Sequence, residues 1–253
     1  MSYAVLQKNL EPPSLDQLKN AFQNVPGLTA LDAFGVGKDA FGILVKGFDL
    51  DSASRLQSAL AAQGVETELV DEAALPPLPE IRNVHRVDCT PDALMIYDAL
   101  GRNFPLKWVD VMMIAAGSVR LIDFNTVEVR RPVAHHGRGG DSPVTLEIKE
   151  QPADHWILEI IVSGAALRYS IVADHAECLL FQYLDSRRTR ELAGNFKLLV
   201  QDLTKAAPQA TVNHGAFYLR ENSPTPFHYP SKNAFYEEIV WLLWQNISKR
   251  PSE

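Results

Sequence analysis

Three arginines, Arg187, Arg188 and Arg190, are the residues best suited by type and spacing to bind an anion. They stand where a helix is expected to start, and positive charge opposes the helix dipole there unless it is paired, so an anionic ligand would be favoured. Pairing with Asp185 and Glu191 of the chain itself is the alternative, since exposed ion pairs of this kind are common. The sequence therefore predicts either an anion site or a solvated group of ion pairs.

A polar stretch earlier in the chain contains two neighbouring histidines and several glycines. His135 and His136 are adjacent, and neighbours on an extended backbone point to opposite sides, so they are poorly arranged to share a metal ion. Residues 137–140 could hold an anion on backbone N–H groups, but the Lys-Ser/Thr pair that completes a P-loop is missing. The stretch is therefore predicted to be the tip of a hairpin.

Three acidic residues and two cysteines complete the candidates for chemistry. Asp88, Asp92 and Asp98 are close in sequence, but a proline interrupts the strand that would align them, so they are expected to be solvated turn residues. Cys89 and Cys178 are far apart and fit no metal or redox spacing, so both are expected to be reduced thiols. The sequence thus predicts no catalytic residue, no metal site and no cofactor.

The composition is that of a globular protein. The chain has 253 residues, of which 46% are hydrophobic and 22% charged, and this length suffices for two domains. The formal net charge of −7 argues against binding nucleic acid or an anionic membrane, because both depend on excess Lys and Arg. No basic region followed by an apolar core opens the chain, and no apolar run approaches about 18 residues. A cytoplasmic protein without a membrane-spanning segment is expected.

Residues 1–72 alternate between strand and helix patterns. Ser14 and Gln17 form a capping-box pattern at the start of the first helix, and Asp51 is expected to cap the second. The expected elements are a strand at 3–8, a helix at 15–25, strands at 28–36 and 41–48, a helix from 51 to 63 and a strand at 65–70. This βαββαβ order resembles the ferredoxin-like fold, in which two helices cover one face of a four-stranded sheet.

A second domain is predicted over residues 84–207, after a Pro-rich acidic linker at 73–83. A strand, a turn at Gly101 and a second strand lead into an apolar run, and the phrase Pro105-Leu-Lys-Trp-Val-Asp-Val111 resembles the opening of bacterial pleckstrin-homology-like (PH-like) domains. The resemblance implies a bent antiparallel β-barrel capped by a helix, which the sequence places at 184–207. Lipid binding is not expected, because the first hairpin turn offers only Arg102 and Lys107 beside an acidic residue.

Residues 208–253 are predicted to form a loop and an amphipathic helix. Phe235, Ile239, Leu243 and Trp244 belong to a broad apolar stripe on this helix, and such a stripe must be buried against something. Packing on the PH-like domain, packing on the ferredoxin-like sheet and contact across a dimer are the three alternatives. These four residues form the predicted interaction surface.

The sequence as a whole predicts an α+β protein with a ferredoxin-like domain, a PH-like domain and a C-terminal helix. The function expected from it is that of a non-catalytic binding or scaffolding protein that acts through protein contacts, with a homo-oligomer as one expected assembly. The alternative is a sensor of a small ligand or anion, with the arginine cluster or the cleft between the domains as its site.

Overall fold

The computed structural model shows an α+β protein whose sheets are open. Within the described part of the chain no sheet closes into a barrel, so the barrel expected over residues 84–207 is not formed there. The structure describes residues 1–39, 41–98, 100–130, 144–164, 167–173, 180–225 and 227–248, with the backbone alone for 124–130 and 144–149. His135, His136 and Cys178 lie outside these residues.

The first 71 residues form a three-stranded antiparallel sheet with helices packed on it, here called the N-terminal unit. Its sheet has the order β2-β1-β3, and β1 pairs antiparallel with both neighbours. The elements are β1 (Tyr3–Gln7), α1 (Leu15–Phe22), α2 (Ala30–Asp39), β2 (Ile43–Phe48), α3 (Leu50–Ala62) and β3 (Thr67–Asp71). A core that includes Phe22, Leu44, Leu56 and Leu60 joins the helices to the sheet.

The strand predicted at residues 28–36 was wrong, because this segment forms α2. Thr29 and Asp32 bond reciprocally at its start: the backbone N–H of Thr29 donates to Asp32 Oδ2 at 2.8 Å, and the N–H of Asp32 donates to Thr29 Oγ1 at 3.2 Å. Such reciprocal bonds satisfy amides that a helix start leaves free. The ferredoxin-like expectation therefore loses one of its four strands.

The N-terminal cap of α3 also differs from the prediction. Asp49, and not Asp51, is the capping residue, and it accepts the backbone N–H of Ser52 at 2.9 Å. Asp51 instead lies in the first turn and forms an ion pair with Arg55 at 2.8 Å.

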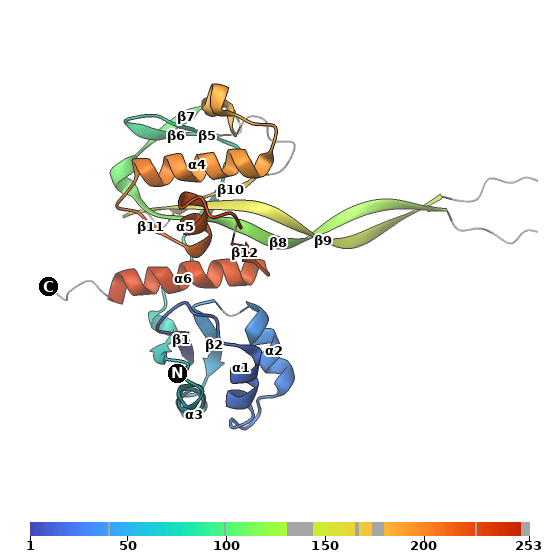
Figure 1. Cartoon of the computed structure of the whole chain (residues 1–253), viewed down its shortest axis with the longest axis vertical. Helices are drawn as coiled ribbons and strands as arrows, with labels where there is room; N and C mark the ends of the chain where they lie inside the picture. Colours follow the sequence, from blue (N-terminus) through green and yellow to red (C-terminus); the bar gives the residue numbers. More distant parts are fainter. Residues whose placement is uncertain are drawn as a thin grey trace, which may run out of the picture.

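The largest sheet has the strand order β11-β8-β9-β10-β4, and β12 also pairs with β8. We call it the hairpin sheet, because β8 and β9 form a hairpin that extends away from the other elements (Figure 1). Its strands are β4 (Glu80–Asn83), β8 (Val111–Arg130), β9 (Val144–Val162), β10 (Leu167–Ala173), β11 (Thr211–Val212) and β12 (His228–Tyr229). The predicted linker at 73–83 thus ends in a strand that joins this sheet by pairing parallel to β10.

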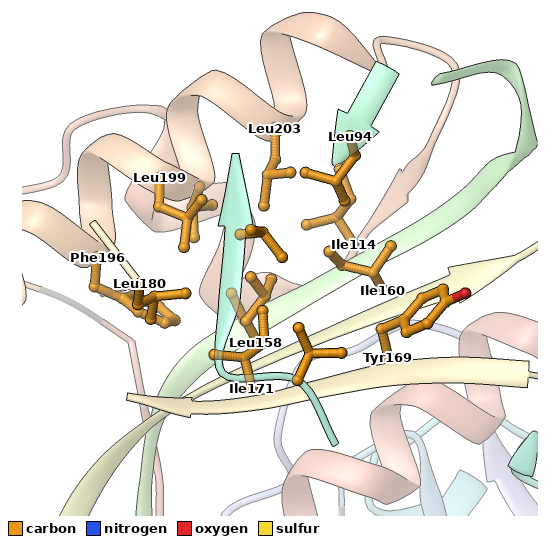
Figure 2. Packing of buried hydrophobic residues seen from close by; sticks show 14 of the residues in the cluster. Leu94, Ile114, Leu158, Ile160, Tyr169, Ile171, Leu180, Phe196, Leu199 and Leu203 are labelled. Atoms are coloured by element: carbon orange, nitrogen blue, oxygen red, sulfur yellow. The ribbon is translucent and has the colours of Figure 1, made fainter. Parts of the chain in front are cut away.

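A smaller sheet and two helices cover one face of the hairpin sheet. The small sheet, of order β5-β6-β7, consists of β5 (Arg86–Cys89), β6 (Ala93–Tyr97) and β7 (Asn103–Lys107). The two helices are α4 (Leu192–Ala206) and α5 (His214–Arg220). Leu94, Ile114, Leu158, Phe196 and Leu203 meet in the core between these layers (Figure 2).

The helix predicted at 184–207 begins later than expected. Residues Gln182–Arg187 form 3₁₀ turns interrupted by a kink at Asp185, and α4 starts only at Leu192. Asp185 has φ 48° and ψ −119°, which lie outside the right-handed helical region, so an α-helix cannot run through it.

The last helix, α6 (Lys232–Ser248), lies between the hairpin sheet and the N-terminal unit (Figure 1). A helix enclosed on two sides needs apolar residues around most of its circumference. Its sequence meets this requirement, with Phe235 and Ile239 facing one core and Val240 and Trp241 facing another.

Candidate interaction surfaces

The structure separates the three arginines of the predicted anion site by their partners. Arg187 donates two hydrogen bonds to Asp202 on α4, from Nη1 to Oδ1 at 3.0 Å and from Nη2 to Oδ2 at 2.8 Å, and this contact raises the pKa of Arg187. Asp202 is thus its partner in place of the expected Asp185 or Glu191. Arg188 and Arg190 are exposed and form no ion pair among the described residues. All three precede α4, so they do not stand in its first turn.

A partly buried thiol, that of Cys89, adjoins this ion pair. Tyr183 donates from its hydroxyl to Asp202 Oδ2 at 3.0 Å, and Cys89 lies beside Tyr183. Burial raises the pKa of the Cys89 thiol to about 12, so the thiol stays protonated at neutral pH. Cys89 is therefore a packing residue, in agreement with the expected reduced state.

The acidic residues considered for metal binding are engaged separately. Asp88 accepts from Arg86 and from the hydroxyl of Tyr97, the latter at 2.7 Å. Asp98 accepts from Arg102 across the β6–β7 turn at 2.7 Å. No group of three or more His, Cys, Asp or Glu side chains in the described ranges could hold a metal ion.

The residues predicted as an interaction surface on α6 are used inside the chain. Phe235, Ile239 and Leu243 are buried against the hairpin sheet, where their neighbours are Met113, Ala115, Val119, Ile157 and Ile161. Trp244 is half-buried, and its Nε1 donates to Glu68 Oε1 on β3 at 3.2 Å. Two of the three expected alternatives therefore apply together, because α6 packs on both the hairpin sheet and the N-terminal sheet.

Trp241 fixes the N-terminal side of α6. Its Nε1 donates to the backbone oxygen of Gln7 at 2.7 Å, and its ring packs against Gly42. A Cβ at Gly42 would lie 2.6 Å from Trp241 Cβ, and Gly42 has φ +85°, so both packing and backbone require glycine here. The Gly42 N–H in turn donates to Gln7 Oε1 at 2.9 Å.

A buried polar cluster on α6 was not foreseen from the sequence. Glu238 is fully buried and accepts from the hydroxyl of Tyr229, and its Oε1 also lies 2.7 Å from His214 Nδ1. Burial, together with Glu238, holds the pKa of Tyr229 well above its usual value, so Tyr229 remains a hydrogen-bond donor.

This arrangement can orient an imidazole as a base, as buried carboxylates do in catalytic pairs. The rings of Phe41 and Phe227 flank His214, with centroids at 5.2 and 5.8 Å. Within the described residues no Ser, Thr or Cys side chain hydrogen-bonds to His214, so a nucleophile is not in place. The cluster joins α5, β12 and α6, and no sequence spacing links its members.

A second buried cluster ties the linker to the hairpin sheet and α6. Arg168 Nη1 lies 2.8 Å from Glu159 Oε1, and Arg168 Nε donates to the backbone oxygen of Pro79 at 3.0 Å. Tyr236 on α6 donates to Glu159 Oε1 at 2.8 Å, and burial raises the pKa of Tyr236 to about 12. Because both charged groups are buried, each depends on the other for its stability in this site.

Beyond its base, the β8–β9 hairpin forms backbone strand pairs only within itself among the described strands. The two strands stay in register from Met113–Ile161 to Arg130–Val144. At the base, β11 and β12 pair with β8 as far as Val119, and β10 pairs with β9 from Trp156 onward. In the described strands both outer edges are unpaired beyond these points, which leaves free backbone N–H and C=O groups.

The two free edges differ in their hydrogen-bonding capacity. Pro152 on β9 has no N–H, and it stands opposite Ile122 on β8, so this pair lacks the reciprocal hydrogen bonds of an antiparallel ladder. The N–H groups of even-numbered β8 residues therefore face outward, which agrees with Ala116 donating outward to Asn213 Oδ1 at 2.9 Å. The β9 edge lacks a donor at Pro152, whereas β8 contains no proline from Arg120 to Arg130.

Comparisons of the chain with protein-family models, with curated proteins and with solved structures find no match. Among the described helices none combines the length and the apolar character that crossing a membrane requires.

Proposed function

We propose that this chain is a binding protein that self-associates through the free β8 edge, residues 120–130, with a second copy of the chain as its partner. The observation that carries the proposal is the length of this unpaired edge on a hairpin that extends away from the body (Figure 1). An isolated two-stranded ribbon is marginally stable in water. Addition of further strands to its edge supplies the missing hydrogen bonds.

A second copy fits this edge by symmetry. The same strand from two copies can pair antiparallel across a two-fold axis, so that each copy presents an identical surface. At about 3.4 Å per residue the free stretch of β8 is roughly 35 Å long, which allows a continuous ladder between copies. The α6 surface is not available for this role, because it is buried between the hairpin sheet and the N-terminal unit.

The proposal is tested by size-exclusion chromatography with light scattering over a range of concentrations. Wild type should approach the mass of a dimer as its concentration rises. One variant replaces residues 130–144 with Asn-Gly, which joins Val129 and Thr145, a hydrogen-bonded pair of the ladder, by a two-residue turn and keeps the ribbon. A second replaces residues 124–150 with Asn-Gly between the paired residues Asp123 and Gln151, and so removes most of the ribbon.

The first variant should still dimerise, and the second should be monomeric with an unchanged core. A wild-type chain that stays monomeric at all concentrations, or a second variant that dimerises normally, would refute the proposal. If neither variant dimerises, the contact lies in residues 130–144, and this result would equally refute the proposal.

A pair of proline substitutions distinguishes the two edges. Thr126 and Ile148 face each other in the register, and by the same alternation both N–H groups point away from the hairpin. Thr126→Pro removes a donor from the β8 edge and should weaken dimerisation, whereas Ile148→Pro removes one from the β9 edge and should leave it intact. Equal effects of the two substitutions would contradict the assignment to β8.

A further inference from the structure

A cleft lies where the N-terminal unit, the base of the hairpin and the start of α6 meet. Its volume is about 790 Å³, within the range of pockets that bind small molecules. Side chains from five elements line it: Lys38 of α2, Arg120 and Ile122 of β8, Pro152 of β9, His228 of β12 and Lys232 of α6 are among them.

Positive charge gathers in this cleft although the whole chain is acidic. Lys38 and Lys232 form no ion pair among the described residues, and Lys232 Nζ lies over the ring of Tyr236 at 5.6 Å from its centroid. Arg120 is paired with Asp154 at 3.0 Å, and His228 Nε2 lies 3.6 Å from the same carboxylate. Two uncompensated ammonium groups therefore remain, beside one satisfied ion pair.

The start of α6 adds to this positive field. Ser231 Oγ accepts the N–H of Ala234 at 3.1 Å, while the first N–H groups of a helix have no partner within it. The helix dipole favours an anion at this end. The cleft therefore combines two lysines from separate elements, Lys38 and Lys232, with the N-terminus of α6, and all three favour a bound anion.

Apolar groups form another part of the same cleft. Leu121, Pro152 and Pro230 line it, and the side chain of Ile122 is 59% exposed there. An inorganic ion would leave these groups in water, whereas a ligand with an apolar body would cover them.

We propose that this cleft binds a small organic phosphate. Its phosphate group lies between Lys38, Lys232 and the start of α6, and its apolar body covers Ile122 and the neighbouring prolines. Two ammonium groups match the double charge of a phosphate monoester at neutral pH. The phosphate-binding lysines, Lys38 and Lys232, lie outside residues 120–130, whereas Ile122 belongs to the β8 stretch proposed for self-association.

The test is isothermal titration of the full chain with phenyl phosphate, inorganic phosphate and benzoate. Phenyl phosphate should bind in the millimolar range or tighter, more strongly than inorganic phosphate, which lacks the apolar body, and than benzoate, which carries a single charge. Absence of phenyl phosphate binding at millimolar concentration would overturn the proposal. Equal affinity for phenyl phosphate and benzoate would also overturn it, because the site would then not select phosphate.

A double variant, Lys38→Gln with Lys232→Gln, locates the site. Its affinity for phenyl phosphate should fall by about tenfold or more. Lys205→Gln is the matched control, because Lys38 and Lys205 are both exposed lysines in the last turn of a helix. The proposal fails if the double variant binds like wild type or if the control loses as much affinity.

Misfolding would not explain the expected loss. Removing a positive charge from the first turn of α6 relieves an unfavourable interaction with the helix dipole, so Lys232→Gln should not lower the melting temperature. The melting temperature of each unliganded variant checks this point.

Discussion

The helix α6 and the β8–β9 hairpin are both long elements, yet they satisfy their polar and apolar groups in opposite ways. α6 has 17 residues and is packed on two sides by other parts of the chain. The strands of the hairpin have 20 and 19 residues, and beyond their base they pair with no other strand of the described chain. The apolar stripe of α6 is therefore buried within the chain, and the unpaired edge of the hairpin is the surface that we propose for a partner.

The largest expected loss comes from the helix. Phe235 is fully buried between α6 and the hairpin sheet, so Phe235→Ala should lower the free energy of unfolding by about 3–5 kcal/mol in urea titrations. Phe104→Ala on β7 is the control, because Phe104 is 47% exposed and its truncation should cost much less. If both variants lose a similar free energy of unfolding, the claim that α6 is packed inside the chain would be contradicted.

The next effect concerns the buried ion pair beneath α6. Arg168→Leu leaves Glu159 buried without its counter-charge and should destabilise the chain by about 3 kcal/mol. The double variant Arg168→Leu with Glu159→Leu should be less destabilised than Arg168→Leu alone, because no unpaired charge remains. A double-mutant cycle measured by urea unfolding gives the coupling, and strictly additive losses would argue against a coupled pair.

A smaller loss is expected on the side of α6 that faces the N-terminal unit. Trp241→Phe removes the hydrogen bond to the Gln7 oxygen, which is buried, and should cost about 1–2 kcal/mol. Tyr3→Phe, on the same strand as Gln7, changes one hydroxyl with no hydrogen bond to α6 and serves as the control. Both variants are compared by thermal unfolding. If Trp241→Phe lowers the melting temperature no more than Tyr3→Phe does, the Trp241–Gln7 hydrogen bond does not hold the N-terminal unit against α6.

The smallest effect is expected at the base of the hairpin. The hydrogen bond from Arg120 holds the pKa of Asp154 below its usual value, with smaller help from His228. A lowered pKa in the folded state gives stability that is present above the unfolded pKa, about 3.9, and is lost as the pH falls through the folded value.

Arg120→Ala should therefore lower the melting temperature slightly at neutral pH, and the gap to wild type should close below about pH 4. The effect is small because both side chains are largely exposed. Added salt should reduce the gap as well. A gap that is constant from neutral to acidic pH would contradict the assignment of the pKa shift to this pair.

Local sequence signals predicted local structure well. The capping box of Ser14 and Gln17 is present, with the Ser14 N–H donating to Gln17 Oε1 at 2.8 Å. The turn between β6 and β7 has Gly101 at φ +77°, as a turn residue with positive φ should. The broad apolar stripe on α6 correctly indicated a helix that must be covered.

The predictions that were wrong or missing depend on contacts between residues far apart in the sequence or on competing local bonds. A strand and a short helix both fit the apolar residues at 28–36, and the bonds between Thr29 and Asp32 favour the helix. Arg187 finds its partner in Asp202 one helix away, and Glu238 finds His214 through the folding of three elements. Neither pairing follows a sequence spacing, so only the tertiary structure reveals it.

Hydrogen exchange on the full chain tests the central claim most directly, measured at a low and at a high protein concentration. Amides of α6 should exchange slowly at both concentrations, because they open only with the packed core. Amides of the even-numbered residues from 120 to 130, whose N–H groups face outward, should exchange rapidly in the dilute sample and become protected in the concentrated one. If protection from exchange instead rises with protein concentration in α6 and not in β8, α6 and not the hairpin edge forms the contact between copies, and the central claim is contradicted.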